Sequence, residues 1–384
     1  MRRPMSGPPR GSPMHLSLAF LTLLASSVAL AAQPPVDRLE RPAPDQSHVQ
    51  FQSFNDVQSL PAGFVAAGRD GLLVQGDGKG NLSPLPSPTS VLLTAVRGQP
   101  GQALWATGHD GLVLRQAPGK PWQRVLDGNR INAMLQAAAQ QRLEKAQAAS
   151  DASPGDSQLS QQLEDAQFYA DDAQASQDAG PARPLLDLWV NDDRRAWAVG
   201  AYGVMLATDD GGAQWRLLDN LPNPERLHLN SVLETAPGVL LVAGEGGRLY
   251  RSDDGGQHWD ALRQLGNGSL YRLIPLAKPG DVLVVGFGGF VARSQDAGVT
   301  WQTLPIPAKA SLFGGTRLDN GGVLLVGQGG NLLYSQDLEH FRLWRDPQQR
   351  GWMAATQLAD GSLELAGRQG LSNLGRNELL EHFQ

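Results

Sequence analysis

A strand–turn–strand unit recurs along the chain at a nearly constant spacing. Each copy joins a run of small and apolar residues to a glycine, a tight turn and a second apolar run, as in LLVAGEGGRLYR at residues 240–251. The glycines that mark the copies are Gly68, Gly108, Gly200, Gly244, Gly286, Gly327 and Gly367. They lie 40 to 44 residues apart, except for 92 residues between the second and the third. A repeat of about 42 residues with this content is typical of one four-stranded propeller blade.

The repeats predict an all-β fold, a seven-bladed β-propeller of four-stranded blades, over residues 47–377. A β-solenoid would have shorter coils, and a helical solenoid would show a period of about 3.6 residues within each repeat. We expect the two chain ends to close the ring, with residues 48–52 supplying the outer strand of the last blade. This pairing would leave no exposed sheet edge at the seam.

A second motif follows the hairpin in several copies. Residues 294–301 read SQDAGVTW, the Asp-box pattern S-x-D-x-G-x-T-W, and close variants begin at Thr208 and Ser252. In such turns Ser and Asp side chains bond backbone N–H groups, and tryptophan packs between strands or blades. The residues predicted to have this structural role are Asp210, Trp215, Asp254, Trp259, Asp296 and Trp301. Because the aspartates recur from blade to blade, we predict turn stabilisation in place of calcium binding or acid catalysis.

Blade three carries a more specific signal. The segments LDLWV at 186–190, AWAVG at 196–200 and ATDDGGAQW at 207–215 resemble a blade of the photosystem II stability/assembly-factor family of BNR (Asp-box) repeat propellers, in its non-photosynthetic bacterial branch. The resemblance covers residues 50–375 apart from one insertion. It implies a non-catalytic scaffold or accessory factor that assists the assembly or function of a membrane protein complex. A transporter of the resistance-nodulation-division (RND) type is one candidate for that complex.

The N-terminal residues predict export. A start with three arginines precedes an apolar run, and small residues around Ala31 supply a signal-peptidase site. We therefore predict a cleaved signal peptide at residues 1–31, a flexible proline-rich leader at 32–46 and a periplasmic protein, with an uncleaved membrane anchor as the alternative. The chain contains no cysteine, which excludes disulfides, thiolate catalysis and lipid attachment to a cysteine.

The long gap between repeats corresponds to an insertion at residues 127–184, in or after blade two. Good helix formers dominate it, apolar residues at 131–138 have helical spacing, and residues 150–157 contain a break, so we predict an α-helical hairpin. Nine acidic against four basic residues make the insertion acidic. It is either a solvated decoration or a docking arm for a partner, with Phe168 and Tyr169 as the anchors.

Several functions lack their sequence signals. The formal net charge of −6 provides no basic footprint for nucleic acid. The histidines are scattered, without the spacing of metal ligands. No Ser/His/Asp arrangement, phosphate loop or dinucleotide fingerprint is present. We therefore predict no catalytic residue, no metal and no cofactor, and we expect a monomer that reaches the membrane through its partner.

The alternative function is a carbohydrate-binding or sialidase-like glycoside hydrolase propeller, because Asp-box propellers include sialidases. The segment YRLIP at 271–275 loosely resembles the Arg-Ile-Pro motif of those enzymes, but with one inserted residue. We expect Arg272 on the first strand of blade five, directed into the central channel. Arg272 and two aromatic residues in the turns, Tyr202 and Phe287, are further candidates for binding a partner. A free-standing ligand sensor is the third hypothesis.

Overall fold

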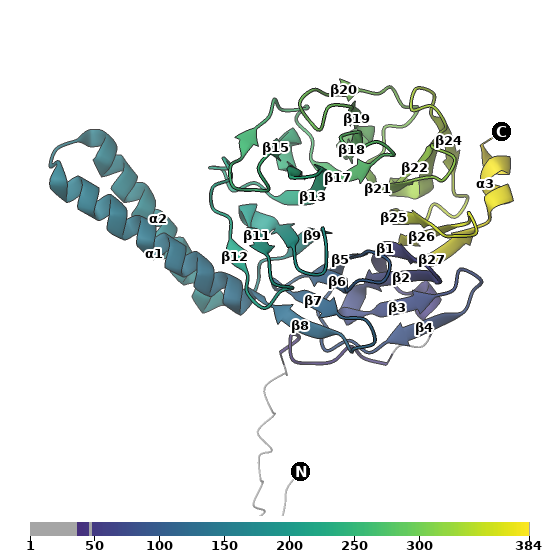
Figure 1. Ribbon diagram of the computed structural model, residues 1–384, viewed down its shortest axis with the longest axis horizontal. Helices are drawn as coiled ribbons and strands as arrows, with labels where there is room; N and C mark the ends of the chain where they lie inside the picture. The colour runs from purple at the N-terminus through teal and green to yellow at the C-terminus, as the bar shows by residue number, and fades with distance from the viewer. Residues whose placement is uncertain (1–36, 46–47, 384) are drawn as a thin grey trace, which may run out of the picture. The chain divides into compact units, whose positions relative to one another are not determined.

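The computed structural model describes residues 37–45 and 48–383, which form seven antiparallel sheets arranged as propeller blades around a channel (Figure 1). The first strand of each blade lies innermost, and the later strands follow outward. Neighbouring first strands contact each other, and the first strand of blade one also contacts that of blade seven. These contacts close the ring, so the prediction of a seven-bladed all-β propeller is confirmed.

Six blades contain four strands and the seventh contains three. Blades one to three comprise β1 (Phe54–Leu60), β2 (Gly63–Gly68), β3 (Leu73–Gly76), β4 (Leu82–Leu85), β5 (Leu93–Gly98), β6 (Leu104–Gly108), β7 (Val113–Gln116), β8 (Gln123–Leu126), β9 (Leu185–Val190), β10 (Ala196–Gly200), β11 (Met205–Thr208) and β12 (Arg216–Leu217). Blades four and five comprise β13 (Leu229–Ala236), β14 (Val239–Gly244), β15 (Leu249–Ser252), β16 (Asp260–Ala261), β17 (Leu270–Pro275), β18 (Val282–Gly286), β19 (Val291–Ser294) and β20 (Gln302–Thr303). Blades six and seven comprise β21 (Leu312–Arg317), β22 (Val323–Gly327), β23 (Asn331–Ser335), β24 (Arg342–Arg345), β25 (Trp352–Gln357), β26 (Leu363–Gly367) and β27 (Gly370–Leu374).

The hydrophobic core is divided among the blade interfaces. The described residues form seven apolar clusters, one between each pair of neighbouring blades. Strand β22 has all five residues buried, as expected for a strand covered on both faces. Between blades two and three, Trp105 packs edge-on against the Asp-box tryptophan Trp215, with ring centroids 6.2 Å apart. The repeated apolar runs therefore bind the blades to each other.

Four charged side chains meet in the central channel. Arg272 donates from Nη1 to Asp187 (2.9 Å) and from Nη2 to Asp56 (2.8 Å), and Arg97 donates to the same two carboxylates. Ser231 of blade four adds a hydrogen bond to Asp187 (2.8 Å). Burial by itself would raise the pKa of Asp187, but the charges of Arg97 and Arg272 outweigh it and hold that pKa below its usual value. This channel ion-pair cluster joins the first strands of blades one, two, three and five.

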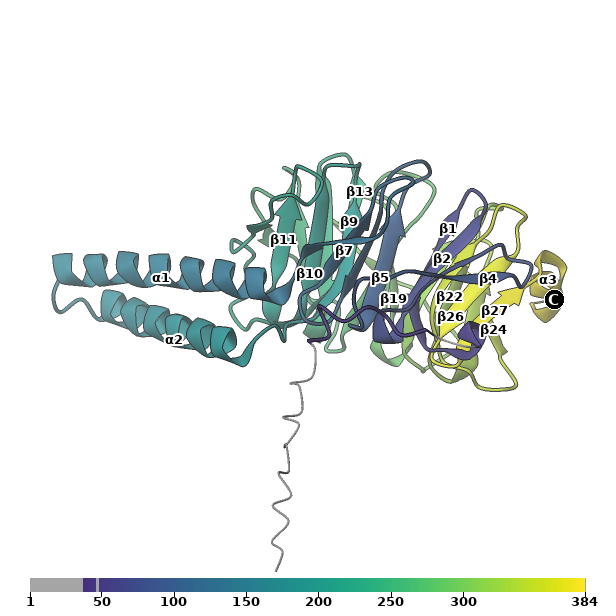
Figure 2. The same ribbon diagram turned by 90° about the horizontal axis from the view of Figure 1, so that it is seen from below.

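A helical hairpin follows β8, as the fold prediction required. Helix α1 (Gly128–Ala152) begins at the N-cap Asp127, and α2 (Ser157–Ala179) begins at Asp156, whose carboxylate accepts from two backbone N–H groups. Figures 1 and 2 show the two helices side by side, extending away from blades two and three. Ile131 is fully buried in the core between these blades, and Met134 and Leu135 pack against that core. The apolar stripe thus fastens the base of the hairpin.

Both ends of the described chain depart from expectation. The predicted outer strand at residues 48–52 is wrong: residues 49–51 form a 3₁₀ turn beside β27. The backbone of His48 is left-handed, and Phe51 and Gln52 donate their N–H groups within the turn, so these donors cannot pair with β27. After β27 a short helix that we did not predict, α3 (Arg376–His382), leads to Phe383, which is buried between blades six and seven.

Residues 37–43 are packed onto the propeller, although they fall in the leader that we predicted to be flexible. Leu39 is buried in the core between blades one and two. The backbone carbonyl of Arg38 accepts hydrogen bonds from Thr89 and Ser90, and the Arg38 side chain pairs with Asp110 at 3.1 Å. The buried Leu39 side chain and these polar contacts together fasten the segment to the propeller.

Strand β26 contains a buried carboxyl group that has no basic partner among its hydrogen bonds. Glu364 is 4% exposed, and the amide of Asn373 is its hydrogen-bond donor at 3.2 Å. Burial raises the pKa of Glu364 to about 7, since the ionised form would lose its hydration. The carboxyl is therefore largely neutral in the folded protein below neutral pH.

Arg272→Met should destabilise the fold by about 3–5 kcal/mol, because it leaves two buried carboxylates short of a partner. The matched control is Arg317→Met on β21, where the side chain is exposed and the expected change is below about 0.5 kcal/mol. Urea unfolding followed by circular dichroism measures both. Equal unfolding free energies for the two variants would mean that the cluster does not hold the ring together.

Glu364→Gln should remove a pH dependence of stability. In the unfolded chain the carboxyl ionises near its ordinary pKa of 4.5, whereas in the fold it ionises near 7. Stability should therefore fall as the pH rises through this window, and the neutral variant should gain up to about 3 kcal/mol at alkaline pH. Unfolding free energies at acidic and alkaline pH test this, with the exposed Glu339→Gln as control. Parallel pH profiles for wild type and Glu364→Gln would contradict it.

Candidate functional site

The residues that the sequence singled out for partner binding lie in four places. Tyr169 and Tyr202 line one crevice between the hairpin and blade three. Phe168, next to Tyr169 on α2, is 67% exposed and does not line the crevice. Phe287 is 61% exposed in the matching turn of blade five. Arg272 belongs to the channel ion-pair cluster, where Asp56 and Asp187 occupy its guanidinium.

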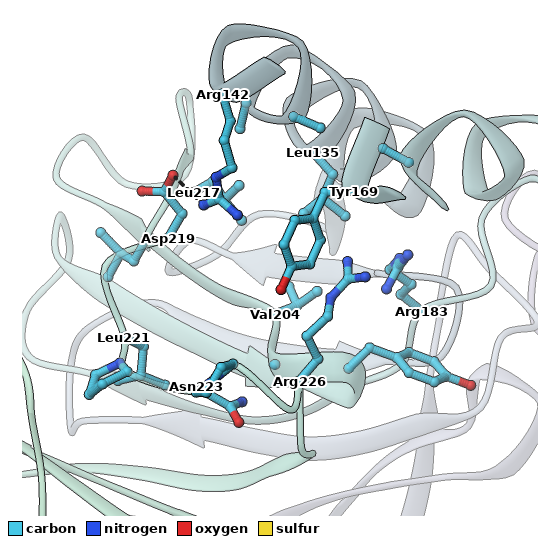
Figure 3. Close-up of a pocket in the computed structure, with 18 residues that line it drawn as sticks. Leu135, Arg142, Tyr169, Arg183, Val204, Leu217, Asp219, Leu221, Asn223 and Arg226 are labelled. Carbon is cyan, nitrogen blue, oxygen red and sulfur yellow. Dashed lines mark ion pairs between the residues drawn. The ribbon is translucent and has the colours of Figure 1, made fainter. Parts of the chain in front are cut away.

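The crevice is formed by both helices, the loop after β12, the turn at residues 202–204 and Arg183, and it has a volume of about 350 Å³ (Figure 3). Helix α1 contributes Leu135 and Arg142, and α2 contributes Tyr169. The loop at residues 218–227, between β12 and β13, supplies the opposite wall with two leucines and two prolines. Asn223 fixes this loop, because its side-chain amide both donates to and accepts from the backbone of Leu227.

Two guanidinium groups hold the Tyr169 ring. The Arg142 guanidinium carbon lies 5.2 Å from the ring centroid, and that of Arg226 lies 5.4 Å from it. Cations over an aromatic face are attracted by the electron-rich face of the ring. Arg226 reaches this position from a left-handed backbone conformation (φ 53°), which is unfavourable for a residue other than glycine. Tyr169 therefore links the hairpin to the blade-three loop.

The carboxylate of Asp172 lies close to two guanidinium groups. Asp172 of α2 accepts from Arg226 at 2.7 Å and lies 3.5 Å from Arg183. The Arg183 guanidinium also lies 5.3 Å from the ring centroid of Tyr202, another left-handed residue (φ 57°). Burial, and then the charge of Arg226, lower the pKa of Arg183, although an arginine stays protonated in proteins. Arg142 lies 3.8 Å from Asp219, so the three guanidinium groups of the site share two carboxylates.

The Asp-box residues sit in tight turns outside the crevice. In blade five the Asp296 carboxylate accepts from the backbone N–H of Thr300 at 2.8 Å, and Trp301 donates to the carbonyl of Gly298 at 2.9 Å. Hydrogen bonds from His258 hold the pKa of Asp254 well below its usual value. Asp210 makes the same backbone contact in blade three. These contacts are those that a turn-stabilising role requires.

Other kinds of site are not supported within the described residues. No group of three or more His, Asp or Glu side chains there could hold a metal ion. None of the described helices is long and apolar enough to cross a membrane. In the channel, Arg97 and Arg272 are both paired with Asp56 and Asp187, and the exposed Arg317 lines the same channel.

Residues 170–357, from α2 to the first strand of blade seven, match the family model described as photosynthesis system II assembly factor YCF48. The chain is a β-propeller that is similar to the photosystem II assembly-factor family over these residues. The photosystem II assembly lipoprotein Ycf48 of Synechococcus sp. (strain CC9902) is 42% identical over 84 residues, which is 21% of this chain and only 24% of that relative.

Solved structures agree on the fold. YCF48 from Cyanidioschyzon merolae superposes with a TM-score of 0.55 at 14% identity, covering 86% of this chain and 96% of that one. The WD40 β-propeller domain of Doa1 gives a TM-score of 0.57 at 9% identity, covering 88% and 95% of the two chains. At such low identity these likenesses establish the propeller architecture alone.

The three arginines of the crevice were not identified from the sequence as site residues. In the sequence, Arg142 and Arg183 are two of the four basic residues of an acidic insertion. Arg226 follows the segment NPE in a proline-containing loop. Charge gave no signal for them, because the insertion is acidic and the loop at residues 218–227 holds two acidic residues and one basic residue. Without the fold, nothing showed that the base of the hairpin lies beside the loop of blade three.

Tyr169→Ala should loosen the base of the hairpin, because both guanidinium groups lose the ring between them. We expect a loss of about 1–2 kcal/mol and faster amide hydrogen exchange along α2. Phe168→Ala is the control: it removes an aromatic ring from the next residue, and we expect a change below about 0.5 kcal/mol. Equal exchange rates in the two variants would show that Tyr169 does not fasten the hairpin.

Proposed function

We propose that the protein is an exported, non-catalytic scaffold that assists the assembly or function of a membrane protein complex, and that a segment of this partner binds in the hairpin–blade-three crevice. The observation that carries the proposal is the crevice itself, a cavity of about 350 Å³ with an apolar wall and a cationic rim. The relationship to proteins named as assembly factors supports the scaffold role.

The hairpin is well suited to a docking role. Its helices pack along each other, but their sequences are rich in alanine and glutamine and leave little apolar surface to bury against the propeller. A helical pair of this kind gains stability when another chain covers it. Tyr169 and Tyr202 present aromatic surface where that chain would enter, and rigid aromatic side chains with arginine are the usual energetic centres of interfaces.

A non-catalytic role is supported by the state of the channel. In propeller hydrolases of the sialidase kind, arginines at the channel mouth bind the substrate carboxylate. Here Arg97 and Arg272 are paired with aspartates, and this arrangement favours a structural role for these two arginines. Scaffold function then falls to the rim of the ring, where the crevice lies.

The proposed function includes a cellular location and a partner. We propose a periplasmic protein released by cleavage after residue 31 and acting as a monomer. The 384 residues contain no cysteine, so within them no thiol can carry a lipid, unlike the relative that is named as a lipoprotein. The membrane complex proposed from the family resemblance is an RND-type transporter.

Crosslinking capture from intact membranes tests the function. The full chain should capture a membrane-embedded protein, identified by mass spectrometry, and the double variant Arg142→Glu/Arg226→Glu should capture at least about tenfold less. Arg263→Glu, an exposed charge reversal in blade four, should capture as wild type does. Circular dichroism shows that each variant is folded.

Equal capture by the wild type and the crevice variant would overturn the placement of the site. Failure of every form to capture a membrane protein would overturn the scaffold role. Capture of a membrane protein other than an RND-type transporter would leave the scaffold role standing and remove the RND partner.

A further inference from the structure

A second cavity adjoins the crevice at the base of the hairpin. Its volume is about 330 Å³, and α1, α2 and the chain between α2 and β9 all contribute to its lining. Arg183, Tyr202 and Arg226 line both cavities and therefore form the wall between them. The bridge from Arg226 to Asp172 crosses this wall.

The second cavity contains a polar acceptor and a polar donor that are both unused. Asn132 is 2% exposed; its amide nitrogen donates to the backbone carbonyls of Ser176 (2.9 Å) and Gly180 (3.0 Å), and its Oδ1 has no partner. Arg183 is 8% exposed; its Nη2 donates to the Ser176 hydroxyl (2.6 Å), and its Nε has no partner. Buried polar groups are normally paired, so two unpaired groups tied to the same serine are unusual.

These two unpaired atoms determine which chemical group can bind in the cavity. Oδ1 of Asn132 needs a hydrogen-bond donor, and Nε of Arg183 needs an acceptor. A carboxylate or phosphate offers acceptors and leaves Asn132 unpaired, whereas an ammonium group offers donors and leaves Arg183 unpaired. A peptide group supplies both, through its N–H and its C=O. The exposed ring of Tyr202 lies at the same cavity and provides a surface for a neighbouring side chain.

We infer that this cavity binds an extended main-chain segment of a partner protein, with one peptide group bonded to Asn132 and Arg183. This inference rests on the proposed function, because the bound segment belongs to the scaffold's partner. Both unpaired atoms are covered in the free protein, so the segment reaches them only when side chains at the cavity move. Side chains flanking the bound peptide group then enter the adjoining crevice.

The probe is a phage library of random dodecapeptides, selected on the immobilised full chain. Calorimetry measures the affinity of each enriched peptide, and an N-methyl scan replaces its backbone N–H groups one at a time. N-methylation at one position should weaken binding about tenfold, because the acceptor on Asn132 loses its donor. Methylation at positions outside the cavity should change the affinity less than about twofold.

Protein variants test the same contact from the other side. Arg183→Lys keeps the charge and removes Nε–H, and it should also weaken the selected peptides about tenfold. Tyr202→Ala should weaken them as well, whereas Phe287→Ala, at an exposed aromatic in the matching turn of blade five, should not. Tyr202 is largely exposed, so its variant keeps the test informative if Arg183→Lys unfolds.

Four results would overturn the inference: no enriched peptide, a flat N-methyl scan, equal effects of Tyr202→Ala and Phe287→Ala, or displacement of the peptides by acetate or inorganic phosphate. The last would identify an anion site. A membrane protein captured through the crevice together with a flat scan would leave the proposed function standing without this contact. A clear scan without any membrane capture would leave the peptide site standing without the scaffold role.

Discussion

The ion pairs in the central channel are the interaction on which the arrangement of blades depends. Asp56 and Asp187 are almost fully buried, and their charges are tolerable because Arg97 and Arg272 approach from other blades. Removing one partner would strand a buried charge, so the first strands hold each other at a fixed position. The same pairing occupies Arg97 and Arg272, while Arg317, Gln58 and Thr356 line the channel outside the cluster.

The base of the hairpin has the opposite character. There Tyr202 and Arg226 hold unfavourable left-handed backbones, Asp172 faces two guanidinium groups, and Asn132 and Arg183 keep polar atoms unpaired. Unfavourable backbone and unpaired polar groups persist where the surrounding structure enforces them, and such places are often functional. The propeller thus pairs the buried charges at its centre, and the base of the hairpin is one of several places where a buried polar atom has no hydrogen-bond partner.

The family relationship covers only part of this rim site. The match begins at residue 170, within α2, so α1 and most of α2 lie outside it, whereas the blade-three loop lies inside. Arg226 and Tyr202 therefore belong to the matched propeller, and Asn132, Arg142 and Tyr169 belong to the insertion. A partner bound in the crevice would contact both, which is how an inserted arm can adapt a shared propeller to a particular partner.

The sequence by itself determined the propeller, because a strand that must be buried on both faces leaves a repeated apolar run and each turn leaves a glycine at a fixed spacing. It likewise determined the hairpin, through helical spacing at residues 131–138 and a capped break before α2. Only the tertiary structure decided that His48 turns where a strand was expected, that Leu39 is buried and that Arg272 pairs with two aspartates. It also brought Arg226 to Tyr169, which is 57 positions earlier in the sequence. Such contacts join residues that are far apart in the sequence. No short sequence motif marks them, because they depend on where the folded chain places each residue.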